Sequence, residues 1–255
     1  MKKLIWILLL CFALTACANE EPLQTEAPSG EPTSAESVIV TEALTQPPTE
    51  APTELSTETP TEPPTELPTQ PPEDDELVRV ADFIPGIREK LMYATEDNFT
   101  GQKIYDFYNS YLRYGTVKKL SAVCEELAEQ GLGILIWDGF RPVSAQAALW
   151  EVCPDPLFVS HPVTGTRTHC RGNAVDLTLV DLETGEKIPM PTDFDVFTDL
   201  ADRDYSDCDP EAAANARLLE TVMEKHGFKP FWAEWWHFTD TDSYPVNEEF
   251  EPAVG

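Results

Sequence analysis

The sequence predicts an α+β domain with a mainly antiparallel central sheet flanked by helices, preceded by a disordered stalk. In residues 76–255, apolar residues recur at helical spacing in some stretches and form short strand-like runs in others. These stretches follow one another in mixed order, with hairpin-like returns and no repeated strand–helix unit, as in domains with antiparallel sheets. Residues 18–75, in contrast, show no hydrophobic periodicity, which predicts the stalk.

The start of the chain has the layout of a secretion signal, which we assign to residues 1–16. Two lysines precede an apolar run at 4–14, and this run is too short to span a membrane. The motif LTAC at 14–17 resembles the lipobox of bacterial lipoproteins, in which the cysteine becomes the lipidated first residue. We therefore expect a lipid on Cys17 that anchors the protein to the extracytoplasmic face of a bacterial cell membrane. An ordinary cleaved signal with an incidental cysteine is the alternative.

Residues 17–75 are predicted to comprise the lipidated cysteine and a disordered linker. Pro, Thr and Glu dominate this segment, with an approximate PTE repeat. Such a composition buries too little apolar surface to offset the entropy of an ordered chain. Proline density and like charges favour extended conformations, so the linker is suited to hold the domain away from the membrane.

The net charge of the chain excludes one class of partner. The sequence contains 46 acidic and 17 basic residues, which give a formal charge of −29. A protein that binds nucleic acid needs basic side chains to neutralise phosphates, so we expect no nucleic-acid partner.

The first half of the predicted domain contains two strands and two helices. The sequence ELVRVADFI at 76–84 predicts an edge strand. Apolar residues at three- and four-residue spacing over 117–127 predict an amphipathic helix with Cys124 in the core. A short buried strand is predicted at 134–137, and the turn DGFRP then leads into a helix at 144–152.

The second half contains two further strands and one long helix. A strand-like run covers 174–180. Asp209 followed by Pro210 predicts the N-cap and first turn of a helix. The helix is expected to end near His226, because the helix dipole favours a cation at this end. The last strand is predicted within FWAEWWHF at 231–238.

Candidate metal ligands lie in two distant stretches. His169 and Asp176 are seven residues apart, a spacing that fits a loop leading into a strand. EWWHF supplies Glu234 and a third donor, His237. A catalytic zinc needs three such ligands if one position is to stay open for water, and a neighbouring glutamate can then accept a proton from that water. Gly172 would allow a close backbone approach or a positive φ.

The cysteines do not form a disulfide scaffold. Cys11 leaves with the signal, and Cys17 and Cys124 already have predicted places. The three that remain allow one bridge at most, and the sequence leaves open whether it forms: Cys153, Cys170 and Cys208. Cys170 follows a candidate ligand directly, and on an extended segment it would point to the opposite face, so we do not expect it to bind the same metal.

The pattern His-x-x-Gly-x-Ala-x-Asp followed by Glu-x-x-His resembles the zinc D-alanyl-D-alanine peptidases, and the dipeptidases among them most. The likeness spans nearly all of residues 77–245. It includes YATEDNFTG at 93–101, IWDGFRP at 136–142, HCRGNAVDLTL at 169–179, TGEKIPM…FD at 184–195 and EWWHF at 234–238. Long, ordered matches of this kind are more specific than a single motif.

The resemblance implies one Zn²⁺ per domain, with the ligands His169, Asp176 and His237. It implies that Glu234 is the general base and that Arg141 stabilises the transition state. Arginine is always protonated and suits the oxyanion that forms, although a structural salt bridge at the turn is the alternative. The resemblance also implies that Asp195 holds the free amino group of the substrate.

The function implied by the resemblance is zinc-dependent hydrolysis of D-Ala-D-Ala, or of related D-amino-acid peptides, outside the cell membrane. Two alternatives stay open. One is a D,D-carboxypeptidase that trims peptidoglycan stem peptides, and the other is a non-catalytic wall-binding lipoprotein. Glu234 argues against the second, because a binding protein has no need of a general base. Asp195 favours the free dipeptide, because an acylated stem peptide has an amide where the dipeptide has an ammonium group.

Overall fold

The computed structural model describes residues 70–254, which lie within one compact unit of the chain. Cys17, the predicted signal and most of the predicted linker lie outside the described residues, so lipidation and disorder there stay predictions. The end of the predicted linker contacts the domain, because the Gly115 amide donates to the Asp74 carbonyl at 3.0 Å. Among residues 70–254, no helix is both long enough and apolar enough to cross a membrane.

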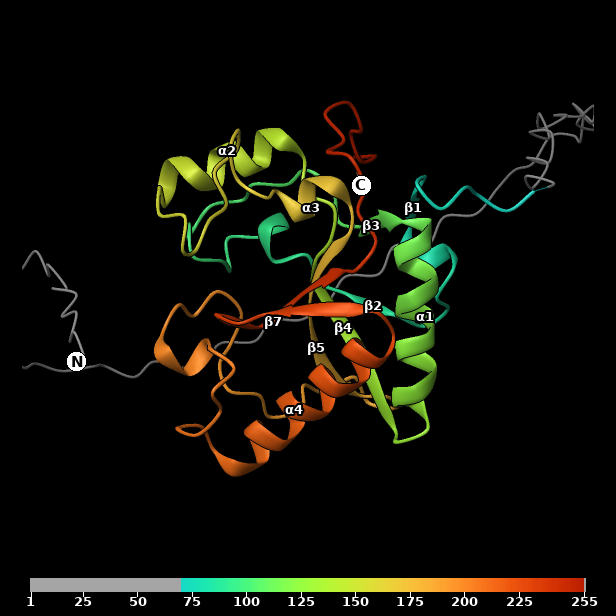
Figure 1. Cartoon of the computed structure of the whole chain (residues 1–255), viewed down its shortest axis with the longest axis vertical. Helices are drawn as coiled ribbons and strands as arrows, with labels where there is room; N and C mark the ends of the chain where they lie inside the picture. Colours follow the sequence, from blue (N-terminus) through green and yellow to red (C-terminus); the bar gives the residue numbers. More distant parts are fainter. Residues whose placement is uncertain (1–69, 255) are drawn as a thin grey trace, which may run out of the picture. The chain divides into compact units, whose positions relative to one another are not determined.

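A five-stranded sheet forms the centre of the domain (Figure 1). Its strands in spatial order are β2 (Arg88–Glu89), β4 (Leu132–Asp138), β5 (Ala174–Asp181), β7 (Glu234–Asp240) and β6 (Phe228–Phe231). β2 runs parallel to β4, and the other three neighbouring pairs are antiparallel. The predicted α+β class and the mainly antiparallel sheet are confirmed.

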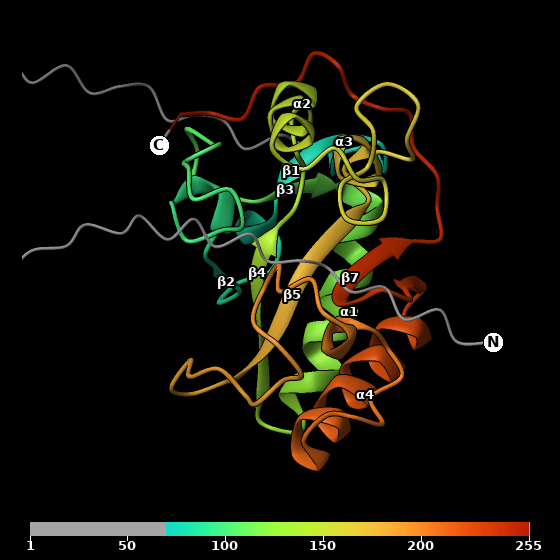
Figure 2. The same ribbon diagram turned by 90° about the vertical axis from the view of Figure 1, so that its left-hand side faces the viewer.

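β4 and β5 are the buried centre of this sheet and lie side by side (Figure 2). Every side chain of β5 from Ala174 to Val180 is buried, which explains the nearly continuous apolar run in the sequence. The strand predicted at 174–180 and the strand predicted at 134–137 are both present, the latter as part of β4.

A separate two-stranded sheet pairs β1 (Leu77–Arg79) with β3 (Tyr111–Arg113). The edge strand predicted at 76–84 is therefore wrong in part. After Arg79 the chain enters a 3₁₀ turn at Val80–Asp82, and it does not join the central sheet. Val80 is completely buried in this turn, and its amide still donates to the Ser110 carbonyl at 3.0 Å, next to the last residue pair of β1 and β3.

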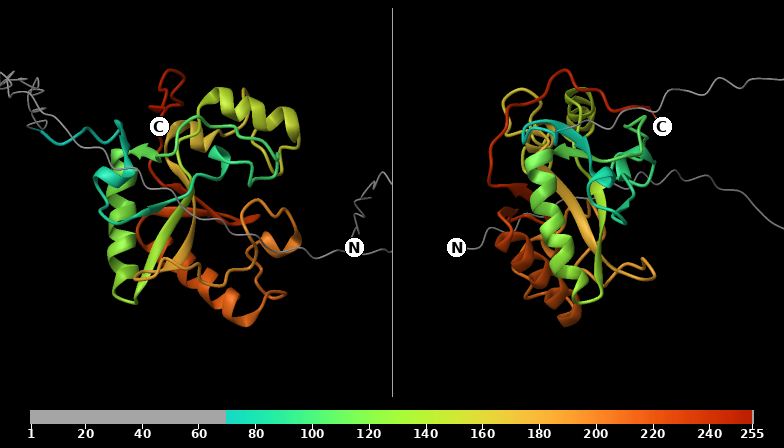
Figure 3. Two further views of the ribbon diagram at one scale, coloured as in Figure 1. Left: turned by 180° about the vertical axis from the view of Figure 1, so that it is seen from behind. Right: turned by 90° about the vertical axis from the view of Figure 1, so that its right-hand side faces the viewer.

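Helices α1 (Tyr114–Ala128) and α4 (Pro210–Lys225) cover one face of the sheet (Figures 2 and 3). The helix predicted over 117–127 lies within α1 and buries its apolar stripe, and Cys124 is partly buried against the core. As predicted, the Asp209 side chain caps α4 by accepting from two backbone amides. His226 follows the helix, and its Nε2 lies 2.6 Å from Glu126.

Two further helices, α2 (Val143–Val152) and α3 (Thr168–Arg171), lie at the end of the sheet where β4 ends and β5 begins (Figure 1). α2 is the helix predicted at 144–152. The four cysteines in the described part of the chain are free thiols, so the disulfide left open by the sequence does not form: Cys124, Cys153, Cys170 and Cys208.

Candidate metal centre

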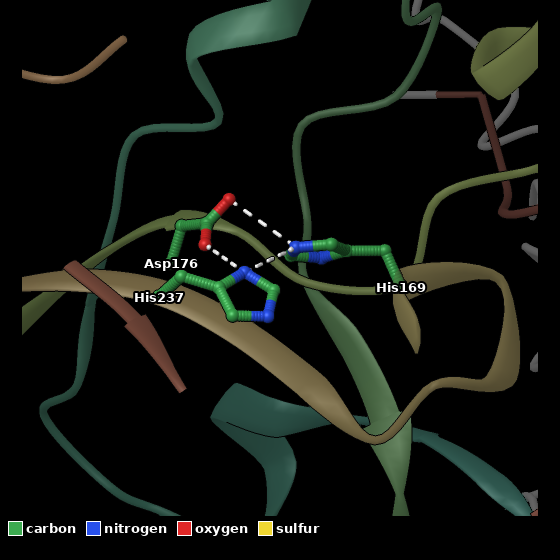
Figure 4. Close-up of side chains that lie close together, drawn as sticks. All are labelled: His169, Asp176 and His237. Atoms are coloured by element: carbon green, nitrogen blue, oxygen red, sulfur yellow. Dashed lines mark hydrogen bonds and ion pairs between the residues drawn. The ribbon is translucent and has the colours of Figure 1, made fainter. Parts of the chain in front are cut away.

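Three side chains from three separate elements converge at this end of the sheet. His169 from α3, Asp176 from β5 and His237 from β7 place their ligand atoms within 4.8 Å of one another. Figure 4 shows the two carboxylate oxygens of Asp176, each facing one imidazole. The distances are 3.3 Å to Nε2 of His169 and 2.9 Å to Nδ1 of His237. The structure therefore brings together the three ligands that the resemblance implies.

Strand register places two of these donors. Asp176 and His237 are direct partners in the antiparallel β5–β7 pair, so their side chains lie on the same face and close together. On its other side, Asp176 is paired with Asp138 at the end of β4, after an irregularity in the ladder. The three residues thus form a row across three adjacent strands.

The third donor, His169, lies in a short helix, which differs from the loop predicted from the sequence. α3 ends before Gly172, which has a φ of 74°, one of the two roles that the sequence allowed for it, and the Gly172 amide donates to the His169 carbonyl at 2.9 Å. Cys170 is therefore helical and not extended, so the geometric reason for excluding it was wrong. It lies outside the donor set, and burial raises the pKa of its thiol to about 11, which disfavours the thiolate that metals bind.

The hydrogen bonds around the donors fit a metal ion. Nδ1 of His169 lies 2.8 Å from the Gly139 carbonyl, which can only accept, so Nδ1 carries the hydrogen and Nε2 has its lone pair free. That lone pair faces Nδ1 of His237 at 3.2 Å. Nδ1 of His237 also lies 2.9 Å from Asp176 Oδ1, so a metal ion at this point would replace one proton and take both nitrogens and the carboxylate as ligands. Two imidazoles and one carboxylate, with the imidazole of His169 oriented by a backbone carbonyl, make a donor set typical of catalytic zinc.

Glu234 lies beside the donor set at the start of β7. Its Oε2 is 3.9 Å from Nδ1 of His237, and the side chain is 13% exposed. Burial raises the pKa of Glu234 well above its usual value, and the nearby carboxylates of Asp176 and Asp195 raise it further. A carboxyl group with a raised pKa can accept and return a proton near neutral pH.

Arg141 is buried and held by neighbouring side chains. Its Nε and Nη2 donate to Asp138 Oδ2 at 3.0 and 2.6 Å, and its Nη1 donates to Gln146 at 3.0 Å. The guanidinium also lies 5.1 Å from the centre of the Tyr93 ring. The salt bridge considered from the sequence is thus present, and the same residue also lines the cavity that contains the three donors.

Asp195 lines this cavity as well and takes part in one partly buried hydrogen bond. The Tyr93 hydroxyl donates to Asp195 Oδ2 at 2.8 Å. Burial raises the pKa of Asp195 to about 8, although the hydrogen bond from Tyr93 opposes the shift. The backbone of Asp195 is left-handed, with a φ of 57°, a conformation that is strained for a non-glycine residue.

The cavity has a volume of about 630 Å³ and one wall made by residues 156–169. Two of its neighbours received no role from the sequence. Asp138 holds Arg141 and also accepts from the Tyr105 hydroxyl at 2.8 Å, and Tyr93 contacts both Arg141 and Asp195. Asp138 carried a detectable signal, because an acid at the end of an apolar strand needs a buried partner.

Comparisons with known proteins identify the family. The sequence matches Peptidase M15, described as D-ala-D-ala dipeptidase, over residues 73–253. A D-alanyl-D-alanine dipeptidase of Escherichia coli is 36% identical over 173 residues, which cover 67% of this chain and 89% of that protein. Another from Enterococcus faecium is 31% identical over 189 residues, with coverages of 67% and 94%.

A solved structure of the LD-carboxypeptidase LdcB aligns with a TM-score of 0.38 and 15% identity, covering 71% of this chain and 72% of that chain. This likeness is too low to support a functional argument. The sequence matches are sufficient to identify the family without this structural likeness, because they extend over almost the whole length of the relatives. The chain belongs to peptidase family M15, the family of the D-Ala-D-Ala dipeptidases.

Proposed function

We propose that this protein is a zinc-dependent dipeptidase that hydrolyses D-Ala-D-Ala to free D-alanine. The observation that carries the proposal is the convergence of His169, Asp176 and His237 in one cavity that Glu234 also lines. The relatives named as D-alanyl-D-alanine dipeptidases support the choice of substrate. A cavity of about 630 Å³ has room for a small peptide.

One zinc ion per domain would be held by Nε2 of His169, Nδ1 of His237 and the carboxylate of Asp176. When bound, zinc would polarise a peptide carbonyl and lower the pKa of a water molecule, so that this water can lose a proton and attack near neutral pH. Glu234 accepts the proton of the attacking water and delivers it to the leaving amine. Its raised pKa suits both steps, because a base with a pKa nearer to neutrality can also act as the acid that returns the proton.

Arg141 stabilises the negative charge that develops on the carbonyl oxygen. Asp138 and Gln146 hold its guanidinium through three hydrogen bonds, so the cation needs no reorganisation when the charge develops. Two of its five N–H groups are not used by these bonds and are available to the substrate.

Asp195 binds the free ammonium group of the dipeptide. Its carboxyl is buried with a raised pKa, so the ammonium would supply the missing countercharge. An acylated stem peptide has an amide at this position and cannot form the charge-assisted hydrogen bond that the ammonium makes. This observation favours the dipeptidase over the D,D-carboxypeptidase.

The proposed location is the extracytoplasmic face of a bacterial cell membrane, through a lipid on Cys17. This proposal rests on the LTAC motif at 14–17 and the apolar run before it. Cys17→Ala should abolish incorporation of a labelled fatty acid and release the protein from the membrane fraction, whereas Cys11→Ala should leave both unchanged. Equal labelling of Cys17→Ala and the unmutated chain would contradict the anchor.

The activity is tested with the full-length chain, purified in detergent and loaded with zinc. We expect release of D-alanine from D-Ala-D-Ala, much slower release from its N-acetylated form, loss of activity with a chelator and recovery when zinc is added back. A stem pentapeptide that ends in D-Ala-D-Ala provides the comparison. Faster release from the pentapeptide than from the dipeptide would replace this proposal by the carboxypeptidase.

A further inference from the structure

The start of β7, which carries both Glu234 and His237, has few strand partners. β5 pairs with β7 at His237 and the two residues after it, so residues 234–236 have no partner on β5, and of these only Glu234 has a partner on β6, Phe231. On the other side, the register of β6 with β7 shifts between Pro230 and Phe231. Pro230 has no backbone N–H to donate to its neighbour strand. The backbone carbonyls in this part of β7 therefore need donors from elsewhere.

Arg203, which lies outside the sheet, supplies those donors. Its Nε donates to the Phe231 carbonyl at 2.8 Å. Its Nη2 lies 3.0 to 3.1 Å from three β7 carbonyls, those of Glu234, Trp235 and His237. The Arg203 amide also donates to the Trp232 carbonyl at 3.0 Å, so both the backbone and the side chain of Arg203 hold this hairpin.

The guanidinium of Arg203 is itself fixed from the other side. Its Nη1 pairs with Glu220 of α4 at 3.0 Å and contacts the Tyr205 hydroxyl at 3.2 Å. The guanidinium carbon lies 4.5 Å from the centre of the Phe238 ring, and the Arg203 side chain is 8% exposed. A buried cation is tolerated because Glu220 balances its charge and the carbonyls accept its remaining hydrogens.

We infer that Arg203 is a positioning residue for the reaction: it holds the backbone of β7 so that Glu234 and His237 face the same point in the cavity. The inference rests on the proposed function for its catalytic consequence. Its structural content, that Arg203 places His237 in the donor set, does not depend on the substrate. Groups that orient a metal ligand in this way commonly contribute 10-fold to 100-fold to metal affinity or activity.

Arg203→Met tests the inference, because it removes every side-chain donor while keeping an apolar stem against Phe238. In the full-length, zinc-loaded protein we expect kcat for D-Ala-D-Ala to fall about 10-fold to 100-fold with a smaller change in KM. We also expect zinc affinity, measured by competition with a chelator, to fall by a similar factor. Arg203→Lys should recover part of both losses, because it keeps the charge and some of the donors.

Arg217→Met is the matched control. Arg217 lies on the exposed side of α4 and stacks on Tyr205 with its guanidinium 5.3 Å from the ring centre, without contacting β7. Arg217→Met should leave kcat and zinc affinity unchanged. A folded Arg203→Met protein with both values within about twofold of the unmutated chain would overturn the inference. If Arg203→Met does not fold, a folded Arg203→Lys protein with unchanged values would overturn it equally. Zinc affinity is measured without turnover, so this arm decides the inference even if D-Ala-D-Ala is not cleaved.

Discussion

The strand-borne and loop-borne parts of the candidate centre are held in place by different means. Asp176 and His237 are direct partners in a sheet ladder. His169 lies in a four-residue helix and Asp195 in a loop. Near these two, the backbone is left-handed at Arg167, Gly172 and Asp195, and none of the residues with positive φ lies in β5 or β7.

This difference has a physical cause. Repeated backbone hydrogen bonds fix the side chains of a strand without unusual backbone angles. A loop reaches a comparable position only through special conformations and side-chain hydrogen bonds, which cost free energy. We therefore expect substitutions of the strand-borne side chains to act on metal binding or catalysis while the fold is kept. Substitutions that disturb the loop-borne backbone should act on stability and metal binding together.

The largest effect should come from the strand-borne residues. Glu234→Gln should retain zinc and lower kcat by about a thousandfold, because it removes the base and leaves the donors. His237→Ala should lower both zinc content and activity, because it removes a donor. Zinc content measured by atomic absorption, together with the rate of D-alanine release, distinguishes the loss of the base from the loss of a metal ligand. A Glu234→Gln protein with a near-normal rate would show that Glu234 is not the base.

The next effect concerns Asp195 in the loop-borne part. Asp195→Asn should lower kcat/KM for D-Ala-D-Ala by about a hundredfold, because it removes the partner of the ammonium group. The rate with the N-acetylated form should change little, so the ratio between the two substrates narrows. Equal losses with both substrates would mean that Asp195 does not bind the amino group.

The pH dependence of KM should also reflect Asp195. Burial raises the pKa of its carboxyl to about 8, and only the ionised form pairs with an ammonium group. As pH falls below this pKa, the ionised fraction falls, so KM for D-Ala-D-Ala should rise by about tenfold per pH unit. Zinc bound to the neighbouring donors would lower the pKa of Asp195, so the rise in KM would begin at a lower pH. Steady-state kinetics of Asp195→Asn should show no such rise in KM.

A smaller effect is expected from Gly172, which ends α3. Gly172→Ala would force alanine into a φ of 74° and place a Cβ 2.5 Å from Leu77 Cδ2. We expect a loss of about 1–3 kcal/mol in the free energy of unfolding and weaker zinc binding, because His169 moves with the helix.

Gly227→Ala is the control for backbone strain, because Gly227 has a φ of 88° but a Cβ at this position would meet no atom closer than 3.5 Å. It should cost about 1 kcal/mol in unfolding free energy and leave zinc affinity unchanged. Equal effects of the two substitutions on zinc affinity would show that the backbone at Gly172 does not position His169.

The smallest effect on activity is expected for Cys170→Ser. Cys170 is completely buried next to a donor but lies outside the donor set. A buried hydroxyl in its place costs about 1–2 kcal/mol of stability, whereas zinc content and rate should stay within about threefold of the unmutated chain. Loss of one equivalent of zinc would show that the thiol is a ligand.

Local patterns in the sequence determined much of the fold. The strand at 174–180, the helix capped by Asp209 and the helix over 117–127 each depend on residues within one short window. The identities of His169, Asp176 and His237 followed from residue type and a family resemblance. These features could be predicted because periodicity, capping and ligand chemistry are properties of neighbouring residues.

The tertiary structure alone decided how distant segments meet. Three features could not be predicted from any pattern in the sequence. These are the pairing of β1 with β3 in a separate sheet, the short helix that contains His169, and the contacts of Arg203 with β7. A four-residue helix is too short for a periodic signal, and its end depends on Gly172 packing against Leu77 of β1. Arg203 acts on carbonyls about 30 residues away, and only the order and register of the strands bring it there.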